Sequence, residues 1–273
     1  MPELPEVETI RRGLEKYLVG KKIIDIEILD KKLLPGQPFH LAGGKVAVVR
    51  RFGKGLVIDL GSGYSIAAHI KMTGQFIYQD KKIKNNLKLP SKYTRLIFKL
   101  DNNAHLFFND VRKFGWIKIL KTSEIKKLSF FKELGPEPFK DLTLKYFQTV
   151  LKKSDMPVKS LLMDQKKIGG VGNIYANDAL NLARIDPRKK SSTLKDAEIN
   201  KLFDAVHAVL KNGLKYGGAT ENNFVNVLGQ SGTYQNHFLA YGRDGEKCYN
   251  CGNIIKKIRL AGRGTYFCSN CQK

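Results

Sequence analysis

The period of the hydrophobic pattern changes along the chain at Leu134-Gly135-Pro136-Glu137-Pro138. Before this segment, short apolar runs alternate with clusters of Gly, Asn and Asp, which is typical of strands joined by turns. The runs cover residues 24–28, 46–49, 56–60, 65–70, 75–78, 95–100, 105–108 and 116–120. After it, residues 144–153, 158–165, 174–185 and 197–216 repeat their apolar positions every three or four residues, which is typical of helices. The sequence therefore predicts an α+β fold, an N-terminal antiparallel β-sandwich followed by a mostly helical region.

The chain opens on Met1-Pro2-Glu3-Leu4-Pro5-Glu6-Val7-Glu8-Thr9. If Met1 is removed, Pro2 becomes a secondary amine with a carboxylate beside it. An α-amino group has a pKa of about 7.7 to 8.0, well below that of lysine, so much of it is nucleophilic at neutral pH. Such an amine attacking a sugar carbon gives an iminium, which suits cleavage of a glycosidic bond followed by elimination.

The same residues could instead serve only to begin a helix. Pro5 is tolerated in the first turn of a helix, and Glu6 and Glu8 would complement the positive end of the helix dipole. Apolar residues then follow at helical spacing, at Val7, Ile10, Leu14 and Leu18. This explanation and a functional one are equally open for Glu6 and Glu8. It does not explain why Pro2 and Glu3 stand at the very start of the chain.

The charge of the chain indicates a polyanionic partner. Lys and Arg number 48 against 25 Asp and Glu, a net charge of +23 that is spread along the sequence. Nucleic acid is the first candidate and an anionic membrane surface the second. Because no apolar run approaches 18 residues and no signal-peptide pattern opens the chain, we expect no membrane insertion and a cytoplasmic location.

Four cysteines form the pattern Cys248-x2-Cys251-x16-Cys268-x2-Cys271, a spacing typical of a zinc ribbon. Two disulfides are the alternative, which a cytoplasmic location disfavours. Because four thiolates leave no position open for water, one structural Zn²⁺ is expected. Such a metal would stabilise a β-hairpin too small to fold alone.

A glycine-rich segment, Ile168-Gly169-Gly170-Val171-Gly172-Asn173, precedes one of the helical stretches. The glycines permit close approach of a ligand to the backbone, and a helix N-terminus attracts phosphate. Asn173 as an ordinary N-cap is the alternative. In the first half, Lys54 lies in a glycine-flanked turn, and Met72, Arg112 and Phe114 lie in turn-like contexts.

These motifs, in this order, resemble the bacterial formamidopyrimidine-DNA glycosylases, bifunctional enzymes that excise oxidised purines and nick the strand. The resemblance covers residues 2–271 and implies four regions: a catalytic β-sandwich domain (1–134), a linker (135–142), a helix-two-turn-helix domain (143–240) and a zinc finger (241–273). It implies that Leu4 favours purine lesions, because the sister endonuclease VIII group generally has glycine there. It also implies that the loop at 217–237 closes over the extruded base.

The resemblance also assigns residue roles. Pro2 would attack C1′, Glu3 would transfer protons, Glu6 would support the site, Lys54 would contact phosphate and assist catalysis, and Arg263 would bind DNA and assist elimination. Met72, Arg112 and Phe114 would fill the space that the damaged nucleotide vacates. The unbranched Met, the planar Arg and the aromatic Phe are chemically suited to this role. The remaining DNA-binding candidates are Lys153, Lys159, Asn173 and Tyr93.

The chain departs from the family pattern at three positions. Tyr93 lies where a histidine-containing Lys-His-x-His pattern is usual, Asp178 where glutamate is common, and Ser160 where proline or alanine is frequent.

The expected partner is damaged double-stranded DNA, bound by a monomer that carries out β-elimination and δ-elimination. Two alternatives are an oxidised-pyrimidine glycosylase on the same scaffold and a non-catalytic damaged-DNA-binding protein. An RNA-binding module would explain the charge but not the N-terminus.

Overall fold

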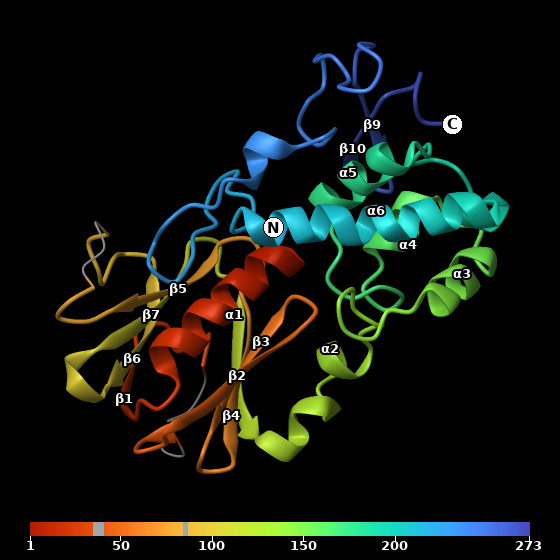
Figure 1. Ribbon diagram of the computed structural model, residues 1–273. Coiled ribbons are helices and arrows are strands. Elements are labelled where there is room, and N and C mark those ends of the chain that lie inside the picture. Colours follow the sequence, from red (N-terminus) through yellow and green to blue (C-terminus); the bar gives the residue numbers. More distant parts are fainter. Residues whose placement is uncertain (35–40, 84–86) are drawn as a thin grey trace. The chain divides into compact units, whose positions relative to one another are not determined.

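The computed structural model describes residues 1–34, 41–83 and 87–273. They form two compact units, coloured along the chain in Figure 1. The first unit comprises Met1–Lys132 and Tyr216–Thr233, and the second comprises Glu133–Lys215 and Tyr234–Lys273. The segment Tyr216–Thr233 thus packs with the first unit, whereas the family resemblance implies that it belongs to the helix-two-turn-helix domain at 143–240.

The first unit contains two antiparallel sheets, as the alternating pattern predicts. One sheet has the strand order β1-β6-β7-β5 and the other the order β2-β3-β4-β8. The strands are β1 (Ile23–Ile28), β2 (Val46–Phe52), β3 (Gly55–Leu60), β4 (Tyr64–His69), β5 (Gly74–Gln79), β6 (Thr94–Leu100), β7 (His105–Asp110) and β8 (Trp116–Lys121). Short helical segments are η2 (Asp101–Asn103), η3 (Thr122–Lys127) and α2 (Ser129–Lys132).

Helix α1 (Leu4–Leu18) packs on the core that the two sheets share. Its buried face is the apolar stripe predicted from the spacing, with Val7, Ile10, Leu14 and Leu18 each at most 1% exposed. Figure 1 shows the helix (red) beside β2 and β3. Burial of this stripe fixes the start of α1, and with it Pro2 and Glu3, against the sheets.

The segment Tyr216–Thr233 joins the same core. Phe224 and Val227 belong to the buried cluster of the first unit, and the carbonyl of Val227 accepts a 2.7 Å hydrogen bond from the backbone N–H of Tyr78. Gly13 of α1 makes room for this contact, because a Cβ there would lie 2.4 Å from Val227. The far end of the segment is therefore anchored on α1 and β5.

The second unit is helical, as the three-and-four spacing predicts. Its helical segments are α3 (Leu144–Lys152), α4 (Val158–Met163), α5 (Asn173–Ala183), η4 (Ser191–Thr193), α6 (Asp196–Lys215) and η5 (Tyr234–His237). The turn between α4 and α5 is held by the segment that begins the unit. Gly135 donates to the carbonyl of Gln165, and Gly169 donates to that of Pro136, both at 2.9 Å.

A two-stranded antiparallel hairpin, β9 (Lys256–Leu260) and β10 (Arg263–Phe267), closes the second unit. Its turn residues Ala261 and Gly262 both have positive φ, 47° and 75°, as a tight two-residue hairpin turn requires. The turn places Arg263 at the exposed tip. Across the described ranges, no helix combines the length and the apolar composition needed to cross a membrane.

Candidate active site and nucleic-acid interface

The start of α1 carries two carboxylates that are withdrawn from solvent. Glu3 is 3% exposed and Glu6 1% exposed, and Pro2 is buried beside them. Glu3 is the N-cap of the helix, and its backbone N–H donates to Oε2 of Glu6 at 2.7 Å, which is half of a capping box. The side chain of Glu6 therefore fixes the peptide next to Pro2.

Lys54 lies in the turn between β2 and β3 and is 4% exposed. The turn is connected to the first turns of α1. Glu8 forms an ion pair with Arg51 at 3.1 Å, and Arg51 donates to the carbonyl of Gly53 at 2.8 Å. Gly53 has φ of 55°, a conformation that glycine adopts at low cost. Glu8 thus has a structural partner in this unit, and through Arg51 it orients the turn that carries Lys54.

His69 is a buried residue at this site that the sequence analysis did not single out. Burial, and then the charges of Lys71 and Lys54, lower its pKa to about 3. Its Nδ1 accepts a hydrogen bond from the backbone N–H of Lys71 at 2.9 Å. The ring is consequently neutral with its proton on Nε2. The signal in the sequence was weak, a single histidine at the end of a strand-like run.

Met72, Arg112 and Phe114 lie together at the surface of the first unit. The guanidinium of Arg112 donates to Sδ of Met72 at 3.1 Å and lies 4.7 Å from the ring centroid of Phe114. Met72 is 42% exposed and Phe114 56% exposed. These exposures exclude a position in the hydrophobic core for the two apolar side chains. An exposed apolar group of this kind is typical of an interaction surface.

Buried Asp110 orients the loop that carries Arg112 and Phe114. Its carboxylate accepts from Gly115 N at 2.8 Å, from Arg112 N at 3.2 Å and from the hydroxyl of Thr73. Because Thr73 follows Met72 directly, one carboxylate positions both surface loops. The backbone N–H of Asp110 also donates to the carbonyl of Tyr93 at 2.9 Å, and the side chain of Tyr93 is 38% exposed.

In the second unit, Lys159 supports the hairpin. Its side chain is 1% exposed, and Nζ donates to the carbonyl of Gly264 at 2.8 Å and to Oγ1 of Thr265 at 2.7 Å. Asn177 on α5 accepts from the backbone N–H of Tyr266 at 2.8 Å. Two helices therefore hold β10, and with it the exposed Arg263. The Lys159 ammonium is directed to the hairpin backbone and not to the surface.

Asn173 is the first residue of α5, after the buried glycines of the turn. Gln165 closes this turn by accepting from Gly170 N at 3.0 Å and donating to the carbonyl of Val171 at 2.7 Å. The positive end of the helix dipole favours an anion at this position. Lys153 is exposed at the end of α3.

Asp178, one of the departures from the family pattern, is a buried anchor. It accepts from the hydroxyl of Tyr234 at 3.0 Å, from Ala240 N at 2.9 Å and from Tyr241 N at 3.0 Å. Burial raises the pKa of its carboxyl above the ordinary range. The shorter side chain at this position therefore still ties α5 to the segment that leads into the hairpin.

The four cysteine sulfurs have the geometry of one tetrahedral metal site. Their Sγ atoms all lie within 4.8 Å of one another, with Cys248 and Cys271 separated by 3.9 Å and Cys251 and Cys268 by 3.5 Å. Bonds of about 2.3 Å in a tetrahedron place sulfurs about 3.8 Å apart. These distances fit one structural Zn²⁺ with four thiolate ligands, and all four cysteines are free, so the two disulfides are not formed.

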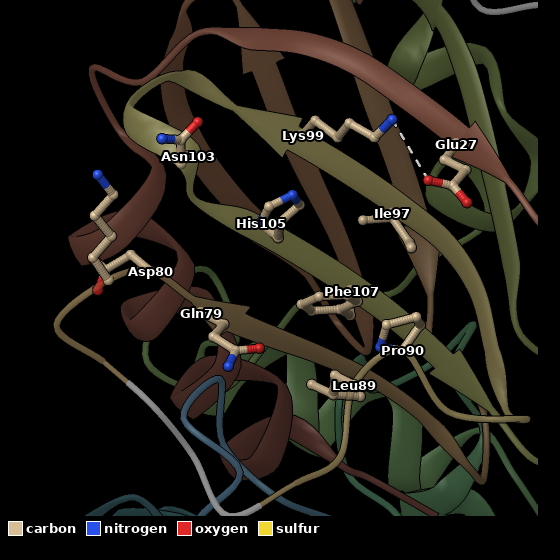
Figure 2. A pocket seen from close by; sticks show the side chains of 11 residues that line it. Glu27, Gln79, Asp80, Leu89, Pro90, Ile97, Lys99, Asn103, His105 and Phe107 are labelled. Carbon is tan, nitrogen blue, oxygen red and sulfur yellow. Dashed lines mark ion pairs between the residues drawn. The ribbon is translucent and has the colours of Figure 1, made fainter.

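A cavity of about 480 Å³ lies on the face of the β1-β6-β7-β5 sheet opposite the core (Figure 2). Its floor includes Ile97 and Phe107. Lys99 at its rim is paired with Asp25 at 2.9 Å and with Glu27 at 3.5 Å. None of the site residues predicted from the sequence lines this cavity. The catalytic site is therefore not placed here.

Three family models match successive parts of the chain. The formamidopyrimidine-DNA glycosylase N-terminal domain matches residues 1–117, the formamidopyrimidine-DNA glycosylase H2TH domain matches residues 134–225, and the zinc finger found in FPG and IleRS matches residues 245–273. A formamidopyrimidine-DNA glycosylase of Pelotomaculum thermopropionicum is 39% identical, over 100% of this chain and 99% of its own length.

Two crystal structures of Lactococcus lactis Fpg, each in complex with DNA, are similar to this chain along its whole length. A mutant bound to DNA containing Fapy-dG aligns with a TM-score of 0.90 at 35% identity, covering 100% of both chains. The wild-type protein bound to DNA containing an oxidised pyrimidine aligns with a TM-score of 0.89 at 36% identity, again covering 100% of both chains.

Proposed function

The chain belongs to the formamidopyrimidine-DNA glycosylase family, and from this premise we propose that it is a bifunctional DNA glycosylase and abasic-site lyase of base excision repair. Oxidised purines, 8-oxoguanine and formamidopyrimidines, are its proposed substrates. The observation that carries the proposal is the buried start of α1. There Pro2, Glu3 and Glu6 lie on the same unit as the Lys54 turn, which the pair Glu8–Arg51 connects to the helix.

In the proposed mechanism, removal of Met1 exposes the secondary amine of Pro2. The amine attacks C1′ of the damaged nucleoside, and the C1′–N bond breaks with its electron pair leaving on the oxidised base. Glu3 transfers protons as the sugar ring opens, so that a Pro2 iminium forms. The iminium withdraws electrons and acidifies C2′, and loss of that proton expels the 3′ phosphate by β-elimination. A second elimination at C5′ completes the δ step.

Binding of the duplex is assigned to cationic and exposed apolar groups. Lys54 and Arg263 would contact phosphates next to the lesion, and Arg263 would assist elimination. Met72, Arg112 and Phe114 would enter the space of the extruded nucleotide. The remaining proposed DNA-binding residues are Asn173, Lys153, Tyr93 and Lys159. For Lys159 we propose an indirect contribution, since its ammonium donates to Gly264 and Thr265.

The zinc ligands Cys248, Cys251, Cys268 and Cys271 would serve the same interface. The metal, when bound, supplies no reaction chemistry, because four thiolates occupy its coordination sphere. The residues themselves hold the base of the hairpin whose tip is Arg263. Loss of these ligands is therefore expected to weaken DNA binding through the position of Arg263.

Oxidised pyrimidines are the one alternative substrate class that a specific observation favours. A relative in the same family has been crystallised with DNA containing an oxidised pyrimidine as well as with Fapy-dG DNA. Leu4, at the start of α1, supports the purine assignment through the family resemblance, because the endonuclease VIII group generally has glycine at this position.

The test compares duplexes that differ only in the lesion, 8-oxoguanine or an oxidised pyrimidine, each opposite its natural partner. Faster base release and strand nicking on the purine duplex is the expected result. Faster release on the pyrimidine duplex would reverse the lesion assignment. Tight binding without cleavage of either duplex would establish a non-catalytic protein.

A further inference from the structure

Glu6 makes a second hydrogen bond that helix capping does not require. Besides accepting from Glu3 N through Oε2, it accepts from the backbone N–H of Ala219 through Oε1, at 2.7 Å. Ala219 lies 213 residues further along the chain, in the segment Tyr216–Thr233 of the same unit. One buried carboxylate therefore joins the peptide beside Pro2 to a loop that is remote in sequence.

The conformation of the loop leaves space for the Glu6 carboxylate. Gly218 has φ of 86°, and a Cβ there would lie 2.9 Å from both Cγ and Oε1 of Glu6. On the far side of the loop, Phe224 and Val227 are buried in the core. Between these two anchors, residues 221–223 are exposed. Glu6 thus fixes the near end of a short exposed tip whose far end is held by apolar packing.

We propose that Glu6 is a positioning residue that couples this loop to the catalytic amine. The inference rests on the proposed function, together with the expectation from the family resemblance that the loop at 217–237 closes over the extruded base. A carboxylate offers two oxygens and can accept from two N–H groups that approach from different directions. A glutamine completes a capping box equally well, but it has only one oxygen and would present its NH₂ group to the second N–H.

The substitution Glu6→Gln therefore separates the two roles. Capping of α1 is retained, whereas the bond to Ala219 is lost or weakened. Excision of 8-oxoguanine should fall roughly tenfold to a hundredfold, the effect of losing a hydrogen bond to a charged group. Cleavage of a preformed abasic site should fall by a clearly smaller factor, because that substrate has no base for the loop to cover.

A second variant keeps the test valid if Glu6→Gln fails to fold. Gly218→Ala should displace the loop from the carboxylate while leaving every residue of α1 in place in the sequence, because alanine is strained at a φ of 86° and its Cβ would lie 2.9 Å from Glu6 and 3.0 Å from Phe224. It should produce the same separation of the two rates. Glu15→Gln is the matched control, since Glu15 is exposed on the same helix, where it pairs with Arg11. Both rates of that control should equal those of the unaltered protein.

Hydrogen exchange of the Ala219 amide in the DNA-free protein gives a readout independent of activity. The amide should be protected in the unaltered protein and should exchange faster in Glu6→Gln. Equal loss of excision and abasic-site cleavage, or unchanged exchange at Ala219, would overturn the proposal. If the unaltered protein cleaves neither substrate, the proposed function fails, and the exchange rates alone decide whether Glu6 holds the loop.

Discussion

The Nζ atom of Lys159 lies 2.8 Å from the carbonyl oxygen of Gly264, in a side chain that is 1% exposed. Gly264 directly follows Arg263, the proposed phosphate-binding residue at the hairpin tip. Lys159, which the family resemblance makes a DNA-binding candidate, thus donates a hydrogen bond to the backbone that positions Arg263, a second DNA-binding candidate. Its contribution to binding should pass through Arg263.

A double-mutant cycle tests this dependence. Lys159→Met leaves the Gly264 carbonyl unpaired and should weaken binding of a lesion-containing duplex roughly tenfold. In an Arg263→Ala background the same substitution should have a much smaller effect, because the residue that it positions is gone. Lys201→Met, which removes an exposed lysine of α6, controls for the loss of one charge. Additive losses in the cycle would instead indicate that Lys159 contacts phosphate independently.

The exposed group Met72, Arg112 and Phe114 should matter for duplex DNA and little for stability. Phe114→Ala removes a side chain that is 56% exposed, so the free energy of unfolding should change by less than about 0.5 kcal/mol. Affinity for a lesion-containing duplex should fall roughly tenfold or more, the usual effect of losing one aromatic contact with a base.

The matched comparison uses a single-stranded oligonucleotide with the same lesion, which has no opposite base and no vacated space in a stack. Phe114→Ala should change its affinity little. Ile24→Ala, which truncates an apolar side chain of β1 that is 55% exposed, should affect neither substrate. An equal loss on single and double strands would contradict a role in filling the duplex.

Neutral His69 should make stability depend on pH. Its pKa is lowered from 6.5 to about 3 in the folded protein, so below pH 6.5 the unfolded chain binds a proton that the folded protein does not. The stabilising contribution is therefore complete above pH 6.5 and is lost as the pH falls toward 3. Between pH 7.5 and pH 5 it should decrease by about 2 kcal/mol.

His69→Asn isolates this effect, because the amide oxygen can accept from Lys71 N without titrating. Denaturant unfolding at pH 7.5, 6 and 5 should show a shallower pH dependence for the variant than for the unaltered protein. Parallel curves for the two proteins would show that His69 is protonated equally in the folded and unfolded states.

Local patterns predicted the elements of this fold well. The strand-like runs coincide with β1 to β8 within a few residues, and the cysteine spacing with a four-sulfur site. The strands and the four-sulfur site could be predicted because each is recorded in the spacing of residues that are close together in the sequence. The surface group at Met72, Arg112 and Phe114 was also anticipated as a group, through resemblance to the family.

Local sequence patterns could not predict side-chain roles that depend on partners distant in the sequence. The bond from Ala219 to Glu6 spans 213 residues and that from Lys159 to Thr265 spans 106. No local period records such pairs, so the capping and loop-binding roles of Glu6 could not be separated. Burial of His69 likewise depends on packing between elements, which a single histidine in a strand-like run does not reveal.

The most direct test of the account is borohydride trapping on a duplex with 8-oxoguanine opposite cytosine. Three proteins are compared: the form processed to Pro2, a form that retains Met1, and Pro2→Gly. Reduction of the iminium should give a covalent protein–DNA band from the processed form, much reduced in the other two, and peptide mapping should place the adduct on Pro2. An equally strong band from the form that retains Met1, or an adduct mapped to a lysine, would contradict the N-terminal amine as the nucleophile.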